Sequence, residues 1–138
     1  MEEKEKQIQE MYLEFQQLEQ YIKQLQRQLE VITHQLMEIS AASNSLDEFK
    51  KITPAKEVFV PLSSGIFAKA SINDNSELLV NVGANVGVTK DIDSTKKLIS
   101  NQLEEIKKIH QQTVEELEKM THRASQLESM MQRLVQQE

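Results

Sequence analysis

The side chains of this sequence that could do nucleophilic, acid–base or metal chemistry are few and badly spaced for it. The three histidines are His34, His110 and His122, and no two of them have the His-Glu-x-x-His spacing that places two metal ligands on one helix face. The chain has no cysteine, which excludes disulfides, thiolate catalysis and cysteine-based zinc sites. We therefore expect no metal ion and no cofactor.

The other candidate motifs have plainer explanations. Acidic pairs such as Glu104–Glu105 are interleaved with lysine on a predicted helix, which is typical of a solvated face. Ser63 and Ser64 have no partner that would make either a nucleophile, and turn chemistry accounts for both. Gly83 and Gly87 lack the spacing of a phosphate-binding loop. The sequence gives no support to an enzymatic function.

The strongest pattern is a ladder of apolar residues whose spacings alternate between three and four. Its rungs are Ile8, Met11, Phe15, Leu18, Ile22, Leu25, Leu29, Ile32, Leu36 and Ile39. This is the a and d pattern of a coiled-coil heptad, with charged residues and glutamines between the rungs. The pattern predicts a long helix that weakens over Ser40–Ser45 and ends before Pro54.

The last third of the chain mirrors the first, although its seam is less apolar. Its rungs are Ile99, Leu103, Ile106, His110, Thr113, Leu117, Met120, Ala124, Leu127, Met131 and Leu134. Asp93 or Ser94 is a plausible N-cap for this second helix. If the chain folds back on itself, facing residues have numbers that sum to about 143, as in Leu36 with Ile106. The two ends of the chain then lie together.

Between the helices the period changes from 3.5 to 2, which predicts four short strands in two consecutive β-hairpins. The connections are rich in Ser, Gly, Asn and Asp, which favour turns. The alternating apolar residues are Val58, Val60, Ile66, Ala68, Ile72, Leu78, Val80, Val82, Val86 and Val88. Four short strands leave exposed edges, so we expect an obligate oligomer that is joined through these residues.

The chain thus divides into an N-terminal helix (1–52), a segment of two β-hairpins (53–92) and a C-terminal helix (93–138). A hydrophobic content of 38 % with only 4 % aromatic residues suits long helices that share a narrow seam better than a compact core. The expected fold is therefore α+β, a long antiparallel coiled-coil hairpin with two central β-hairpins.

This order of elements, together with the stretches Val60–Gly65 and Val82–Val88, resembles the α-class subunits of the prefoldin family. Members of the β class carry a single hairpin, so two hairpins indicate the α class. The resemblance implies a hexamer with two α and four prefoldin β subunits, in which the strands form a β-barrel platform. It also implies an ATP-independent chaperone (a holdase) that captures unfolded proteins at the coiled-coil tips and transfers them to a group II chaperonin.

Methionine-rich ends would suit such a role, because methionine is flexible and polarisable and adapts to many partners. The expected client-binding residues near the two chain ends are Met11, Tyr12, Phe15, Leu127, Met130, Met131, Leu134 and Val135. Tyr12, Met130 and Val135 stand beside the seam, which need not bury them. The others belong to the seam and become accessible only if the helix ends fray; Met11 and Met131 serve equally well as ordinary core residues.

Two alternatives remain open at this point. Prefoldin-like chains can polymerise through their hairpins into structural filaments, and long helices can also act as a tether for one defined partner. The net charge of −6, with no basic block, argues against a nucleic-acid partner. The charged start of the sequence and the lack of a long apolar run predict a cytoplasmic protein without a membrane segment.

Overall fold

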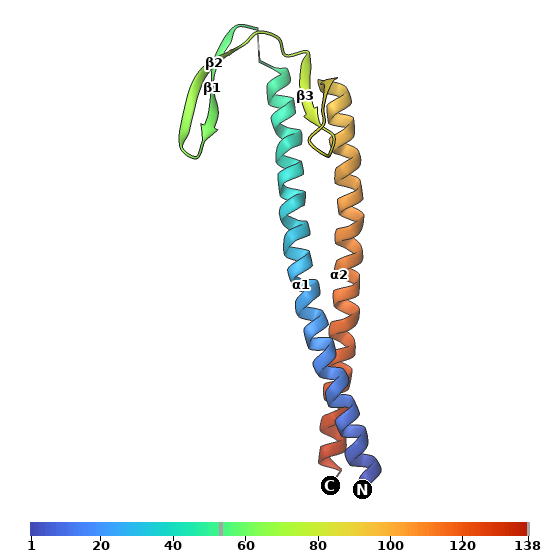
Figure 1. Cartoon of the computed structure of the whole chain (residues 1–138). Helices are drawn as coiled ribbons and strands as arrows, with labels where there is room; N and C mark the ends of the chain where they lie inside the picture. The colour runs from blue at the N-terminus through green and yellow to red at the C-terminus, as the bar shows by residue number, and fades with distance from the viewer. Residues whose placement is uncertain (53, 138) are drawn as a thin grey trace. The chain divides into compact units, whose positions relative to one another are not determined.

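The computed structural model describes residues 1–52 and 54–137. Thr53 and Glu138, which begin the expected hairpin segment and end the expected C-terminal segment, lie outside the described residues. The elements are α1 (Glu2–Lys50), β1 (Lys56–Ser63), β2 (Ile66–Ile72), β3 (Glu77–Asn81), β4 (Gly87–Asp91) and α2 (Ile92–Gln136) (Figure 1). The predicted α+β fold, in which two long helices enclose two β-hairpins, is confirmed.

The chain forms two compact units. Unit 1 combines Met1–Gln35 with Ile106–Glu138, and unit 2 is the continuous segment Leu36–Glu105. In unit 1 the blue start of α1 and the red end of α2 lie beside each other, so the two ends of the chain meet there (Figure 1). Unit 2 contains both hairpins and the helix ends that lead into and out of them.

The seam of unit 1 follows the apolar ladder. Leu25, Ala124 and Leu127 are buried, and every other rung of the two ladders in this unit is half-buried. Burial of one narrow stripe on each helix is the packing of a two-stranded coiled coil, in which the a and d side chains interdigitate. Ala124, which looked like a weak rung, allows close approach of the helices because its side chain is small.

Two polar contacts establish the register of the seam. Arg123 Nε donates to Glu14 Oε1 at 3.1 Å, and the Tyr21 hydroxyl donates to Glu116 Oε1 at 3.4 Å. All four residues precede a seam residue, the g position of the heptad. When the numbers of facing seam residues in an antiparallel pair sum to 142, the numbers of two facing g residues can sum to 137. Both of these pairs have that sum. Both contacts agree with the predicted antiparallel fold-back of the two helices within unit 1.

In unit 2, α1 continues through the serine-rich stretch and ends in a capped turn. Ser45 Oγ donates to the Ala41 carbonyl at 2.9 Å, which keeps this serine compatible with the helix. The Asn75 side chain, from the connection between the hairpins, donates to the carbonyls of Lys50 (3.3 Å) and Ile52 (2.9 Å). It satisfies carbonyl groups that the end of a helix leaves without a partner.

The N-cap of α2 is Asp91, so the predicted cap at Asp93 or Ser94 is wrong. The Asp91 carboxylate accepts from the Ser94 amide at 2.7 Å, and its carbonyl accepts from the Thr95 hydroxyl at 2.8 Å. The hydrogen bonds from Ser94 lower the pKa of the Asp91 carboxyl. Strand β4 runs directly into α2, so its last residue takes the cap position that the sequence pattern placed two residues later.

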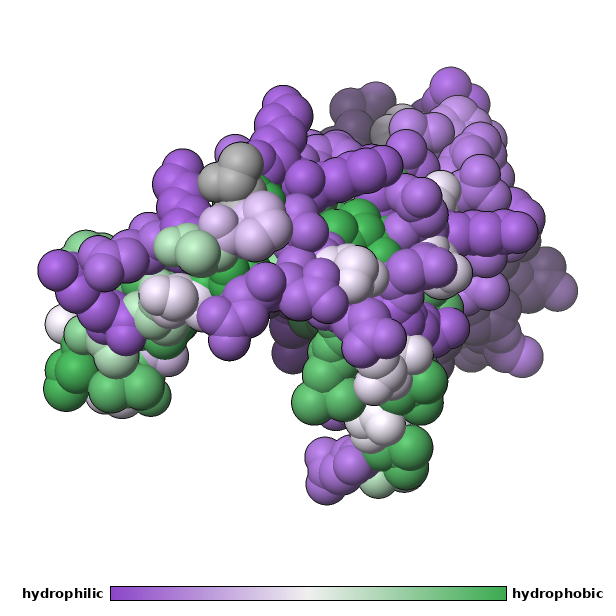
Figure 2. Space-filling model, turned by 90° about the horizontal axis from the view of Figure 1, so that it is seen from above, coloured by the Kyte–Doolittle hydropathy of each residue, from purple (hydrophilic) through white to green (hydrophobic). Residues whose placement is uncertain are grey.

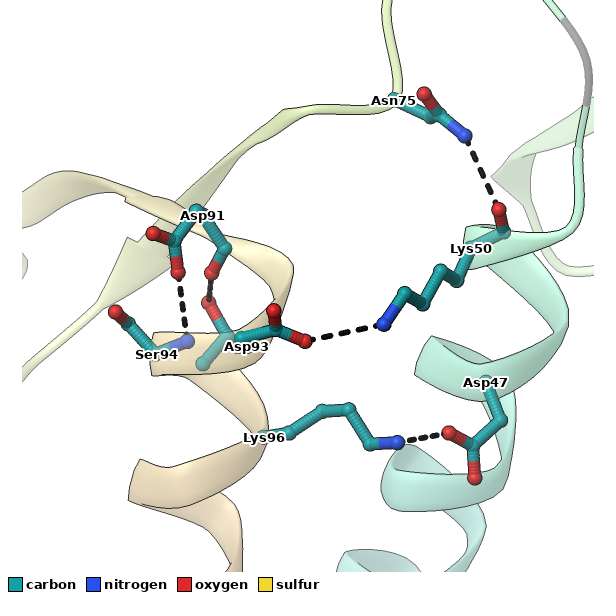
Figure 3. A network of polar contacts seen from close by, with 8 residues as sticks. Asp47, Lys50, Asn75, Asp91, Asp93, Ser94 and Lys96 are labelled. Atoms are coloured by element: carbon teal, nitrogen blue, oxygen red, sulfur yellow. Dashed lines mark hydrogen bonds and ion pairs between the residues drawn. The ribbon is translucent and has the colours of Figure 1, made fainter.

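Ion pairs join the two helices beside this cap (Figure 3). Lys50 Nζ lies 3.2 Å from Asp93 Oδ1, and Lys96 bonds to Asp47, whose pKa this contact lowers. The residue numbers of each pair sum to 143. These side chains are half to largely exposed or, for Lys96, one third exposed, so the pairs add little stability and mainly affect alignment.

The two hairpins are separate two-stranded antiparallel sheets. In the first, Val58 faces Ala70 and Val60 faces Ala68, with a register shift between Pro61 and Ser63. In the second, Val80 faces Val88. An isolated two-stranded sheet is marginally stable in water at best, so these strands need a further surface to pack against.

Candidate functional surfaces

The end of unit 1 presents apolar side chains that the seam does not cover. Tyr12 is 55 % exposed, Met130 38 % and Val135 57 %. Tyr12 and Val135 each follow a seam residue, and these two e positions lie on the same edge of the antiparallel pair. Met130 precedes a seam residue and therefore lies on the opposite edge. Apolar surface thus lies on both edges of this tip.

The seam residues at the same end are only partly covered. Met11, Phe15, Met131 and Leu134 are half-buried. A two-stranded coiled coil has no third layer, so one side of each seam residue stays close to water. These four side chains extend the apolar surface of the tip, although most of each one packs against the facing helix.

Leu127 differs from the other predicted tip residues. Its side chain is only 1 % exposed, the lowest value in the described part of the chain, so in this structure it packs the seam and presents no surface. Its predicted contact with a partner would require the two helices to separate. The sequence pattern could not predict this difference, because periodicity assigns all d positions to the seam and does not show how deeply each side chain is buried.

Two further exposed apolar residues at this end were missed by the sequence reasoning. Leu13 and Met1 are both strongly exposed. Leu13 follows Tyr12 on the outer face of α1, away from the seam, where a leucine has no packing role. An apolar residue at an outer heptad position next to the chain end was the signal that could have identified it.

The apolar strand residues predicted to join subunits fall into two groups. Those that are half-buried are Val58, Val60, Ala68, Ile72, Leu78 and Val80. Those that are exposed lie at or near the turns and are Ile66, Val82, Val86 and Val88. The second group provides uncovered apolar surface for another chain.

The opposite faces of the hairpins were not singled out by sequence, yet they carry the larger exposed side chains. Phe59, Phe67 and Leu79 are all more than half exposed, as is Leu62 near the first turn. Phe59 pairs with Lys69, which lies 3.8 Å from Glu57 on the same face. Figure 2 shows apolar surface gathered over the strands, among largely polar surroundings. Exposed apolar patches of this kind mark interaction surfaces.

Among the described residues, no group of three or more His, Asp or Glu side chains could hold a metal ion. No described helix is long and apolar enough to cross a membrane. The carboxyls whose pKa is lowered, Asp47, Asp74 and Asp91, are exposed and lie in helix ends and turns. Their hydrogen bonds from Lys96, Ser76 and Ser94 explain each shift without any catalytic role.

Comparison with known proteins points in one direction. A family model described as "Prefoldin subunit" matches residues 18–137. Prefoldin subunit alpha of Thermofilum pendens is 28 % identical over 116 residues, which cover 84 % of this chain and 90 % of that protein. Prefoldin subunit alpha of Nitrosopumilus maritimus is 25 % identical over 132 residues, which cover 96 % of this chain and 90 % of that protein.

A solved structure shares the fold. The cryo-EM structure of filamentous PFD from Methanocaldococcus jannaschii superposes with a TM-score of 0.74, at 14 % sequence identity. The match covers 83 % of this chain and 95 % of that one. At this identity the similarity supports the helix–hairpin–hairpin–helix architecture alone.

Proposed function

The chain belongs to the prefoldin family, and on this premise we propose that it is an α subunit of an ATP-independent chaperone that holds unfolded proteins. Its relatives are prefoldin α subunits, which supports a chaperone role and gives no support to an enzyme. The observation that carries the proposal is the exposed apolar surface of the tip, where Tyr12, Met130 and Val135 stand outside the seam.

The proposed mechanism is a multivalent grip. An apolar segment of a client contacts Tyr12 and Val135 on one edge of the tip or Met130 on the other, and each contact is weak. Several tips acting together raise the overall affinity without a new kind of contact. Methionine contributes through its flexible thioether, which adapts to different side chains. The half-buried seam residues add contact area, and Leu127 joins them only when the helix ends separate.

Assembly is proposed to proceed through the hairpins. Two α subunits and four prefoldin β subunits would pair the strand edges and cover the exposed valines of both hairpins, forming a β-barrel platform. The tips would then hold clients in the cytoplasm until transfer to a group II chaperonin. The exposed apolar strand surface supports this arrangement, because an isolated hairpin cannot cover it.

A matched pair of methionine substitutions tests the grip. Met130→Ser removes an exposed tip methionine, whereas Met37→Ser removes a methionine that is 67 % exposed in unit 2. Each variant is assembled with a prefoldin β subunit, and light scattering follows the aggregation of a denatured enzyme without ATP. We expect Met130→Ser to weaken suppression while Met37→Ser leaves it unchanged. Addition of Tyr12→Ser and Val135→Ser to Met130→Ser should weaken suppression further.

Deletion of residues 1–12 and 128–138 extends the test to the whole tip. We expect a complex of the mass predicted for the shortened subunits, without suppression of aggregation. Undiminished suppression by an assembled complex would refute the tip grip.

The second candidate function is a structural filament. The exposed strand surface favours it, since self-pairing of hairpins would cover the same residues. The mass of the protein alone, measured by light scattering, separates the two functions. A filament grows without a partner, whereas an α subunit stays a small oligomer until a β subunit is added.

A further inference from the structure

A groove in unit 1, away from the tip, is lined by two cations, Lys23 and Arg27. Its volume is about 1030 Å³, and α2 contributes Ile109 and Thr113 to it. The residues that α1 contributes are Gln20, Lys23, Gln24, Arg27, Gln28, Val31 and Ile32. No acidic side chain lines it, although the whole chain carries a net charge of −6. The groove is therefore a local basic site on an acidic protein.

Neither cation has an ion-pair partner among the described residues. Within residues 1–52 and 54–137, the recorded ion pairs include neither Lys23 nor Arg27, and Arg27 makes only a long bond to the Lys23 carbonyl at 3.4 Å. Like charges four residues apart on a helix repel each other slightly. An anionic group from outside the chain would remove this repulsion.

The ion pairs of the described residues include none between Lys23 and Glu19, although both side chains line a neighbouring hollow. Glu116 accepts from Tyr21, and the Glu14 carboxylate is engaged by Arg123. Both of these pairs lie on the edge of the seam that the g positions form.

The groove also has an apolar part. Val31 and Ile109 are each about half exposed or more, and neither belongs to the seam ladder. Lys23, Arg27 and Val31 follow one another at intervals of four residues, which corresponds to about 6 Å along the helix. Alternate side chains of an extended peptide are about 6.6 Å apart, so such a peptide matches this row of residues.

We propose that this groove binds extended acidic–apolar segments of client proteins, with two carboxylates against Lys23 and Arg27 and a branched apolar side chain against Val31 and Ile109. The glutamine amides along the groove would bond to the peptide backbone. This inference rests on the proposed chaperone function and names a class of client sequence that the apolar tips do not select. The glutamines and aliphatic residues favour a peptide over a nucleic acid, since no aromatic side chain lines the groove for base stacking.

Fluorescence anisotropy with labelled peptides tests the proposal on the full chain assembled with a prefoldin β subunit. The probe peptide carries two glutamates and a valine at alternate positions, and the comparison peptides replace the glutamates by lysine or the valine by serine. We expect the probe to bind best at low salt, because exposed charges are screened as ionic strength rises. The double variant Lys23→Gln/Arg27→Gln should weaken its binding about three- to tenfold.

The control variant is Lys97→Gln/Lys119→Gln, which removes the same charge from exposed positions outside the groove. It should bind the probe like the parent protein. Equal losses in both double variants would overturn the proposal, because they would show an effect of net charge alone. Tighter binding of a single-stranded oligonucleotide, lost in the groove variant, would also overturn it in favour of a nucleic-acid site.

Aggregation assays separate this proposal from the proposed function. Suppression of aggregation for an uncharged apolar client should survive Lys23→Gln/Arg27→Gln, since the tips are intact. If the assembled parent protein suppresses no client at all, the proposed function fails. If it suppresses aggregation but does not bind the acidic probe, only the groove proposal fails.

Discussion

Truncation of the Leu127 side chain tests whether this residue packs the seam or forms part of the client-binding surface of the tip. Its side chain is 1 % exposed, so Leu127→Ala removes a fully buried isobutyl group from the coiled coil. Buried Leu→Ala changes cost about 2–5 kcal/mol, with the value set by how far the site can collapse. A two-stranded seam lies close to solvent and can collapse partly, so we expect a loss of about 2–3 kcal/mol.

Thermal unfolding followed by far-UV circular dichroism measures this loss. One kcal/mol shifts the midpoint of a domain of this size by about 3–5 °C, so we expect a decrease of roughly 6–15 °C. Protein and partner concentrations must be held constant, because assembly also stabilises the folded chain. The measurement is made on the assembled complex and on the chain alone.

Two leucines provide the controls. Leu134, at the last rung of the same seam, is half-buried, and its replacement by alanine should cost less than half as much. Leu13 is 57 % exposed, and Leu13→Ala should leave the midpoint within about 2 °C of the parent value. Equal destabilisation by all three variants would refute the argument from burial. Loss of client binding by Leu127→Ala at unchanged stability would instead make Leu127 a contact residue.

Three further predictions concern the cap, the turn and the register. Asp91→Ala should lower the unfolding midpoint through loss of the N-cap, whereas Asp91→Asn, which still accepts from the helix amides, should lower it much less in the same thermal assay. Because the pKa of Asp91 is lowered, its carboxylate stabilises the fold above pH 3.8 and loses this effect as the pH falls through the lowered pKa. In an acid titration, the stability of Asp91→Asn should therefore depend less on pH below pH 4. Gly83→Ala should slow or weaken assembly, because a residue with a side chain is strained at a φ of +123°. Gly87→Ala should be tolerated, because its Cβ would meet only the flexible side chain of the exposed Leu79. The mass of the complex distinguishes the two variants. A double-mutant cycle on Glu14 and Arg123 should give a coupling of about 0.2–1 kcal/mol, and zero coupling would contradict the g–g pairing that establishes the register.

Much of the fold follows from period alone. The alternation of three and four over the two ladders predicts the helices, and the change to period 2 predicts the strands. The approximate register follows from the fold-back of two helices of nearly equal length, which pairs residues whose numbers sum to about 143. The contact between Glu14 and Arg123 agrees with this fold-back.

The features that the sequence did not predict correctly are those that do not depend on the spacing of apolar residues. The N-cap of α2 is Asp91 and not the predicted Asp93 or Ser94, because β4 continues directly into the helix. The backbone conformation at that junction determines which residue caps the helix. Asn75 lies 25 residues from the carbonyl of Lys50 that it caps, and no local pattern could show that contact. Both cases depend on where the hairpins return the chain, which is a property of the tertiary structure.

The tip shows the same limit in its functional residues. Periodicity correctly separated Tyr12, Met130 and Val135 from the seam, because a residue beside an a or d position cannot be fully covered by one facing helix. It could not distinguish Leu127 from Leu134, since both are leucines at d positions and differ only in how the facing helix covers them. Beyond Leu127, the last two rungs of α2, Met131 and Leu134, are half-buried. These rungs are therefore partly accessible, and under the proposed function the exposed residues beside them would need no fraying to reach a client.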